Sequence, residues 1–149
     1  LQLPKESKPL TNATDIMSRH AFHYLSQRGI TQQDIVKYNI HYSEEGELKN
    51  MAIIPSYDAN GFLNYYVGRS FDKNAYIKHK LASSTKDIIG FEMYINWDLP
   101  VILCEGAFDA MGSGEVEEQW AREHHGLWLK ELQEKGHAPD PGKTAHPAE

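Results

Sequence analysis

The sequence has very little cysteine, and this scarcity narrows the classes of protein to which it can belong. Cys104 is the only cysteine among 149 residues, so neither an internal disulfide nor a cysteine-based zinc site can form within the chain. No apolar run approaches the roughly 18 residues that a membrane span needs. We therefore expect a soluble protein from a reducing, cytoplasmic setting with no membrane partner.

The histidine pairs lack further metal ligands nearby in the sequence, and no nucleophile is grouped with a base. His20 and His23, and His124 and His125, have no evident third ligand for zinc nearby in the sequence. No arrangement of a nucleophile with a base recommends hydrolase or lyase chemistry. We expect these histidines to be exposed on helices.

What is present is an ordinary globular composition with an uneven charge. Hydrophobic residues make up 40% and charged residues 24%, and the formal net charge is −6. Residues 112–149 contain eight acidic and four basic side chains, whereas residues 64–80 contain four basic side chains and a single acid. A locally basic strip therefore lies within an acidic chain, and clustered cations favour a phosphate-bearing partner.

Two helices are expected near the start of the chain, after an arm at residues 1–13. Thr14 is a plausible N-cap for a helix with apolar residues at helical spacing, and Gly29 is a typical C-terminal stop. Thr31 repeats the N-cap signal, with Asp34 three residues later, and predicts a short second helix.

Extended segments follow. The alternation predicts strands over 51–57, 62–71 and 76–80, with a hairpin turn at 58–61 between the first two. Such neighbours form an antiparallel meander. Pro55 lacks an N–H donor, so we expect it on an edge or at a bulge.

After the meander, the sequence predicts a short helical stretch and then the start of a β-α unit. Ser84 or Thr85 can cap a short helical stretch that runs through Phe91 and Tyr94. The apolar run 101–104, followed by a glycine turn and a helical start, is typical of a buried parallel strand that begins a β-α unit, with Cys104 in the core.

The C-terminal third has a different character. Gly112-Ser113-Gly114 has the composition of a linker, and residues 115–136 predict an acidic amphipathic helix with Trp120 and Trp128 near one face. Residues 137–149 are rich in proline, which indicates a disordered tail.

Several segments in this order resemble a known family. YLSQRGIT (24–31), AIIPSYDANGFLNYYVGRSF (52–71), YIKHK (76–80) and VILCEGAFDAM (101–111) are similar to the RNA-polymerase core of bacterial and phage DNA primases of the TOPRIM type. The resemblance spans roughly residues 19–111. It implies an α+β fold in which an antiparallel meander with short helices (14–98) is followed by the first strand of a truncated TOPRIM α/β unit (99–111) and the appended C-terminal helix.

The resemblance also implies a catalytic acid. Glu105 matches the family's catalytic, metal-associated glutamate, and Asp109 matches an aspartate of the same acidic cluster, which would hold Mg²⁺. Carboxylates at a strand end suit metal-assisted phosphoryl transfer. The alternatives are that Glu105 interacts with a helix dipole and that Asp109 is a solvated helix acid.

The same resemblance implies a role for the basic strip at residues 64–80. Arg69 and Lys78 match cations that bind the incoming nucleoside triphosphate or the single-stranded DNA template, and Lys80 and Lys49 lie close to them in the sequence. Aromatic rings beside cations hold single strands without reading sequence, although the same rings can form the inward face of a meander. The rings concerned are Tyr65, Tyr66, Phe71 and Tyr76.

Some residues depart from the family pattern. No Asp-x-Asp motif follows Glu105, and no zinc-binding module precedes the core; Met51, His79 and Leu81 replace residue types common in the family. We therefore expect a primase fragment that keeps nucleotide or single-strand contacts, with Mg²⁺ weakly bound or absent and little primer synthesis. The alternative is a non-catalytic protein in which the appended helix drives homo-oligomerisation or captures a partner.

Overall fold

A computed structural model describes residues 1–84, 87–104 and 106–112 of the chain. The chain divides into two compact units, Leu1–Tyr94 and Ile95–Glu149. Within the described ranges, no helix is long and apolar enough to cross a membrane.

The N-cap of the first helix, α1 (Ile16–Gln27), lies one residue later than predicted. The N-cap is Asp15 and not Thr14: the Asp15 carboxylate accepts a hydrogen bond from the Ser18 N–H at 2.8 Å, and the Ser18 hydroxyl oxygen accepts one from the Asp15 N–H at 3.0 Å. The bond from the Ser18 backbone lowers the pKa of Asp15. Leu25 is 0% exposed, so one face of α1 packs into the core.

The second helix, α2 (Gln32–Lys37), confirms the predicted cap at Thr31. The Thr31 hydroxyl accepts from the Asp34 N–H at 3.1 Å, and the Asp34 carboxylate accepts from the Thr31 N–H at 2.9 Å. This reciprocal capping box satisfies two backbone donors at the start of a helix of only six residues.

A short 3-10 turn, η1 (Glu92–Tyr94), is attached to the end of α2. The Tyr94 hydroxyl donates to the Lys37 carbonyl at 2.7 Å, and the Tyr38 ring meets the Tyr94 ring edge to face at 4.8 Å. Burial raises the pKa of Tyr94. Within the described residues, the helical stretch predicted through Phe91 and Tyr94 is observed only as this single turn, and both rings contact the Tyr38 ring.

The sheet of the first unit is an antiparallel meander, as predicted, and the class is α+β. Its order follows the sequence, from β1 to β5. The strands are β1 (Lys8–Pro9), β2 (His41–Ser43), β3 (Met51–Tyr57), β4 (Leu63–Ser70) and β5 (His79–Leu81). The sequence analysis did not predict β1: Lys8 pairs with Tyr42 within the segment expected to be an arm. The strand predicted at 76–80 is observed only from His79 to Leu81, because the residues before it belong to a loop.

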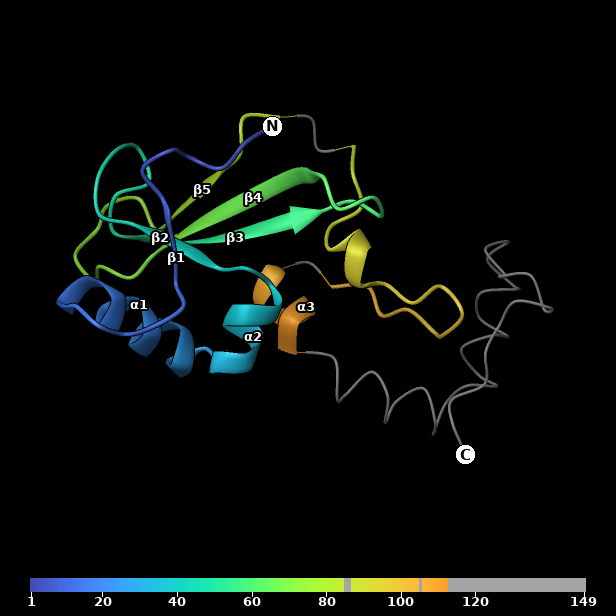
Figure 1. The fold of residues 1–149 in the computed structure, drawn as a ribbon, viewed down its shortest axis with the longest axis horizontal. Coiled ribbons are helices and arrows are strands. Elements are labelled where there is room, and N and C mark those ends of the chain that lie inside the picture. Colours follow the sequence, from blue (N-terminus) through green and yellow to red (C-terminus); the bar gives the residue numbers. More distant parts are fainter. Residues whose placement is uncertain (85–86, 105, 113–149) are drawn as a thin grey trace. The chain divides into compact units, whose positions relative to one another are not determined.

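The two faces of the sheet are covered differently. Figure 1 shows α1 and α2 on one face. On the other face, Met51 and Ile53 pack with Leu48, Leu3 and Tyr66. Because neighbouring residues of a strand point to opposite faces, the intervening Ala52, which is 0% exposed, points toward the helices. Strand β3 is therefore buried on both sides and is the centre of the core.

Pro55 lies in β3 where its missing donor is tolerated. The pairing of β2 with β3 covers Met51 to Ile53 only, so Pro55 lies beyond it, and the register with β4 shifts between Ser56 and Tyr57. A proline next to an irregularity and without a strand on one side loses no ladder bond there.

The predicted strand at 101–104 is not observed. Residues 101–104 have no strand assignment, Leu103 is 95% exposed, and Cys104 is exposed and not part of a core. An apolar run becomes a buried parallel strand only beside a neighbouring strand under covering helices. No parallel pair occurs among the strands of the described ranges.

The rest of the predicted TOPRIM start is described only in part. Helix α3 (Ala107–Gly112) confirms a helical start after Gly106 and ends at Gly112, the first residue of the predicted linker. Glu105 lies outside the described residues, as do the remaining linker residues, the predicted helix at 115–136 and the predicted tail at 137–149.

Candidate functional site

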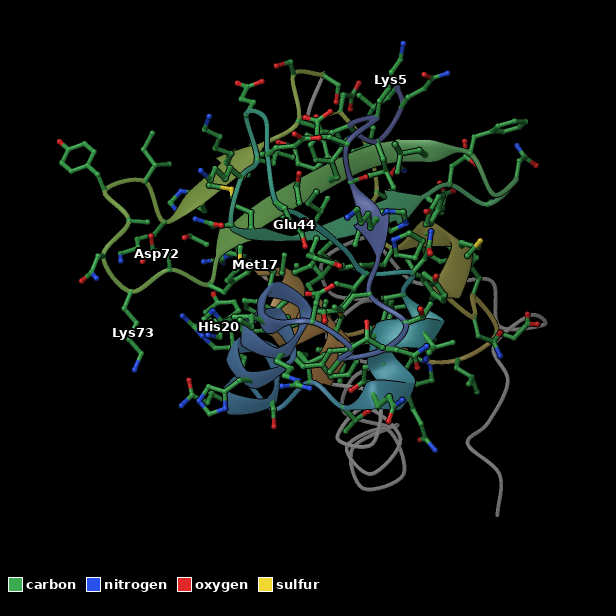
Figure 2. All side chains as sticks on the ribbon, turned by 60° about the vertical axis from the view of Figure 1, so that its left-hand side comes forward. Lys5, Met17, His20, Glu44, Asp72 and Lys73 are labelled. Carbon is green, nitrogen blue, oxygen red and sulfur yellow. The ribbon has the colours of Figure 1, made fainter. Side chains whose placement is uncertain are left out.

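Arg69 lies close to the C-terminal end of strand β4. Arg69 pairs with Ala52 of β3 and His79 of β5, so it shares the face of Ala52, on which the helices pack. On that face the C-terminal end of α1 carries Tyr24, and Arg28 follows as its C-cap. The loop 71–78 leaves β4 on the same side as α1 (Figures 1 and 2).

These elements enclose a hollow of about 400 Å³. We call it the cationic hollow. It is lined by Tyr24, Arg28, Arg69, Ser70, Phe71, Asp72, Lys73 and Lys78. The two residues that the sequence analysis put first for nucleotide or template binding, Arg69 and Lys78, thus line the same surface.

The charge of the cationic hollow is strongly one-sided. Four lining residues carry a positive charge and one carries a negative charge. The Asp72 carboxylate is engaged in its own turn, where it accepts from the Asn74 N–H at 2.9 Å. Arg28 lies over the Tyr24 ring, 5.5 Å from its centroid, which orients the guanidinium at the wall. Such a concentration of cations favours a polyanionic ligand.

The loop 71–78 is held by its own hydrogen bonds. The Lys78 ammonium donates to the Lys73 carbonyl at 2.7 Å, and the Ser70 N–H donates to the Lys78 carbonyl at 2.9 Å. The Phe71 N–H donates to the Asn50 carbonyl at 3.0 Å, which ties the start of the loop to the end of the β2–β3 connection. The two lysines of the cationic hollow, Lys73 and Lys78, are therefore carried by an ordered loop, which lowers the entropy lost on binding.

The sequence analysis did not name five of the eight lining residues as binding candidates: Tyr24, Arg28, Ser70, Asp72 and Lys73. Tyr24 and Arg28 belong to the segment YLSQRGIT that carries the resemblance, and Lys73 belongs to the basic strip. The signal was therefore visible, but no spacing rule says that the end of α1 meets the end of β4.

Two other predicted binding residues do not line the cationic hollow. Lys80 pairs with Gly68, so it points to the opposite face from Arg69. There its ammonium donates to the Glu47 carbonyl at 3.1 Å and lies 3.6 Å from the Glu47 carboxylate. Lys49 is exposed in the connection before β3.

Only one of the two predicted metal ligands lies within the described residues. Asp109 is exposed on α3 in the second unit, and its predicted partner Glu105 is not described. In the described ranges no three His, Cys, Asp or Glu side chains form a group able to hold a metal ion.

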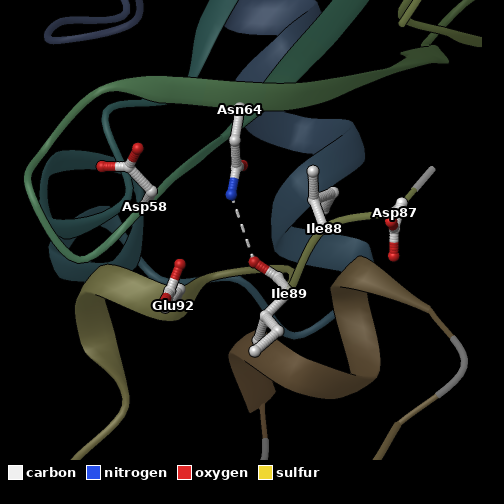
Figure 3. Close-up of a pocket in the computed structure, with 6 residues that line it drawn as sticks. All are labelled: Asp58, Asn64, Asp87, Ile88, Ile89 and Glu92. Atoms are coloured by element: carbon white, nitrogen blue, oxygen red, sulfur yellow. Dashed lines mark hydrogen bonds between the residues drawn. The ribbon is translucent and has the colours of Figure 1, made fainter. Parts of the chain in front are cut away.

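A second hollow, of about 500 Å³, lies at the other end of β4 and has the opposite charge. Figure 3 shows its acids, Asp58, Asp87 and Glu92, around Asn64, whose amide donates to the Ile89 carbonyl at 3.3 Å. The Asp58 carboxylate accepts from the Asn60 N–H at 2.9 Å. An acidic lining repels phosphate, so the cationic hollow is the better candidate for an anion.

Comparison with known proteins adds one structural similarity. Neither a family model nor a curated protein matches the sequence. Among solved structures, the E. coli primase catalytic core is similar over 54% of this chain, with a TM-score of 0.43 and 14% identity. The matched region covers 36% of that structure. At this identity and TM-score, the similarity does not show what this chain does.

Proposed function

We propose that the cationic hollow binds the phosphates of a nucleoside triphosphate or of single-stranded DNA, in a chain derived from a TOPRIM-type DNA primase. The observation that carries the proposal is that Arg69 and Lys78 line one hollow with Arg28 and Lys73. The ordered motifs of the sequence supply the link to primases, which use such contacts on nucleotide and template.

The chemistry of the lining suits phosphate groups. An arginine offers a planar fork that can bind two phosphate oxygens, and a lysine adds a compact charge. A hollow of about 400 Å³ is within the usual size range for small-molecule sites. Ser70 and the backbone of the loop add polar groups, and Tyr24 and Phe71 add rings at the wall.

We propose binding without efficient primer synthesis. Joining two nucleotides requires divalent metal beside the reacting hydroxyl and triphosphate. The sequence offers Glu105 and Asp109 for this purpose but no Asp-x-Asp after them. A primer-synthesis assay with labelled nucleotides should give little or no product. Clear templated dinucleotide product would refute this part of the proposal.

The binding part is tested with fluorescence anisotropy of a labelled oligothymidylate at low salt. Arg69→Ala and Lys78→Ala should each weaken binding about 10- to 150-fold, since a hydrogen bond to a charged group contributes about 1.5–3 kcal/mol. The matched control is Lys5→Ala, which removes one exposed lysine from a site that Figure 2 shows well separated from Lys73.

The outcomes are separable. Loss of affinity in the Arg69 and Lys78 variants, with Lys5→Ala unchanged, supports the proposal. Equal effects of all three variants would mean that affinity follows net charge and not the cationic hollow. Competition of the oligothymidylate by a nucleoside triphosphate tells whether both ligands use the same cations.

A further inference from the structure

We propose that Tyr76, at the tip of the loop 71–78, stacks on a base of a single-stranded nucleic acid whose phosphates lie in the cationic hollow. This inference rests on the proposed function and deepens it. The inference favours a single-stranded nucleic acid that extends beyond the cationic hollow as far as Tyr76. A single nucleotide whose phosphates lie in the cationic hollow would not need this second contact.

The first observation is the exposure of the loop tip. Tyr76 is 100% exposed and its neighbour Ile77 is 48% exposed. The ring therefore contributes nothing to the core, and its whole surface is accessible to a partner. Tyrosine also pays little conformational entropy when it is fixed on a partner.

The second observation is the position of this ring relative to the cations. Tyr76 lies two residues before Lys78 and three after Lys73, and both lysines line the cationic hollow. Two residues span at most about 7 Å along the chain, a distance that one nucleotide can bridge. A strand with a phosphate at Lys78 can thus place a base against the ring of Tyr76.

The third observation is that the loop is ordered. The Ala75 N–H donates to the Asp72 carbonyl at 3.2 Å, which closes a turn just before Tyr76. On the other side, the Lys78 ammonium holds the Lys73 carbonyl at 2.7 Å. A ring presented by a tied turn loses less freedom on binding than a ring on a loose loop.

The neighbouring sheet edge favours a nucleic acid over an added protein strand. Strand β5 has only three residues and carries Lys80, and Lys78 precedes it. Short edges with lysine are a common means of preventing strand addition. Sequence-tolerant base stacking beside a positively charged groove, in contrast, is how single strands are bound.

The test uses the full chain and two labelled probes, an oligothymidylate and an abasic oligonucleotide of the same length. Tyr76→Ala should weaken oligothymidylate binding about 5- to 100-fold, the usual range for one stacked base, while Tyr76→Phe keeps the affinity within about twofold. Neither change should alter binding of the abasic strand or of a nucleoside triphosphate.

The control is Phe62→Ala, which removes a ring that is 70% exposed in the turn at the far end of β4. It should leave both probes unchanged. A Tyr76→Trp variant adds a second readout. Oligothymidylate should quench its fluorescence more than that of the unsubstituted chain, which has three tryptophans of its own, and the abasic strand should not.

The remaining outcomes overturn the inference in recognisable ways. If Tyr76→Ala binds oligothymidylate normally while Arg69→Ala does not, the stacking inference is wrong and the proposed function stands. If the unsubstituted chain binds neither probe, both fail. If Tyr76→Ala changes only the oligomeric state in sedimentation, the tip is a contact between copies of the chain.

Discussion

Leu25 is the side chain whose removal tests most sharply how α1 is fixed on the sheet. It is 0% exposed, and it directly follows Tyr24, which lines the cationic hollow. Leu25→Ala removes three carbon atoms, which is about 2.4 kcal/mol at ~0.8 kcal/mol for each buried methylene. The cavity left behind adds to this transfer loss, so we expect a total of about 2.5–4 kcal/mol.

The assay is urea denaturation followed by circular dichroism. For a domain of this size the expected loss lowers the midpoint by about 1–2 M urea. The matched control is Ile16→Ala on the same helix, where the side chain is 68% exposed and the change should stay within about 0.5 kcal/mol. Equal losses for the two variants would contradict the assignment of the buried face of α1.

Three smaller predictions follow from local contacts. Asp15→Ala should lower the thermal midpoint more than Thr14→Ala, because Asp15 caps α1. Burial lowers the pKa of His41 below its ordinary value of 6.5, so the neutral ring is favoured in the fold and stability is lost as the pH falls below that value; His41→Gln should flatten this acid slope in denaturation at several pH values. Gly68→Ala places a Cβ 3.0 Å from the Met51 sulfur and should destabilise the protein by about 1 kcal/mol. An unchanged midpoint in calorimetry would contradict this prediction.

Much of the first unit could be predicted because its signals are local. The cap at Thr31, the hairpin turn at 58–61 and the alternating strands 51–57 and 62–71 depend on residues close in sequence, and the hairpin is observed within one residue of its predicted bounds. Strand β1 gave no such signal, because a two-residue strand containing a proline has no period to detect.

The errors came from features that depend on distant partners. An apolar run such as 101–104 has the composition of a buried strand, but composition does not say whether another strand lies beside it. Lys80 was grouped with Arg69 because both belong to one basic strip, and only the β4–β5 register places them on opposite faces. The contribution of Arg28 depends on how the end of α1 meets β4, which no local rule specifies.

The salt dependence of oligothymidylate binding tests most directly whether the cationic hollow holds phosphates. Each phosphate neutralised on a single strand adds about −0.7 to the slope of log K against log salt concentration, so four cations predict a slope near −3 for the unsubstituted chain. Arg69→Ala should make this slope shallower by about 0.7, and the double variant Arg69→Ala/Lys78→Ala by about 1.4. A slope that stays the same in both variants would contradict the account.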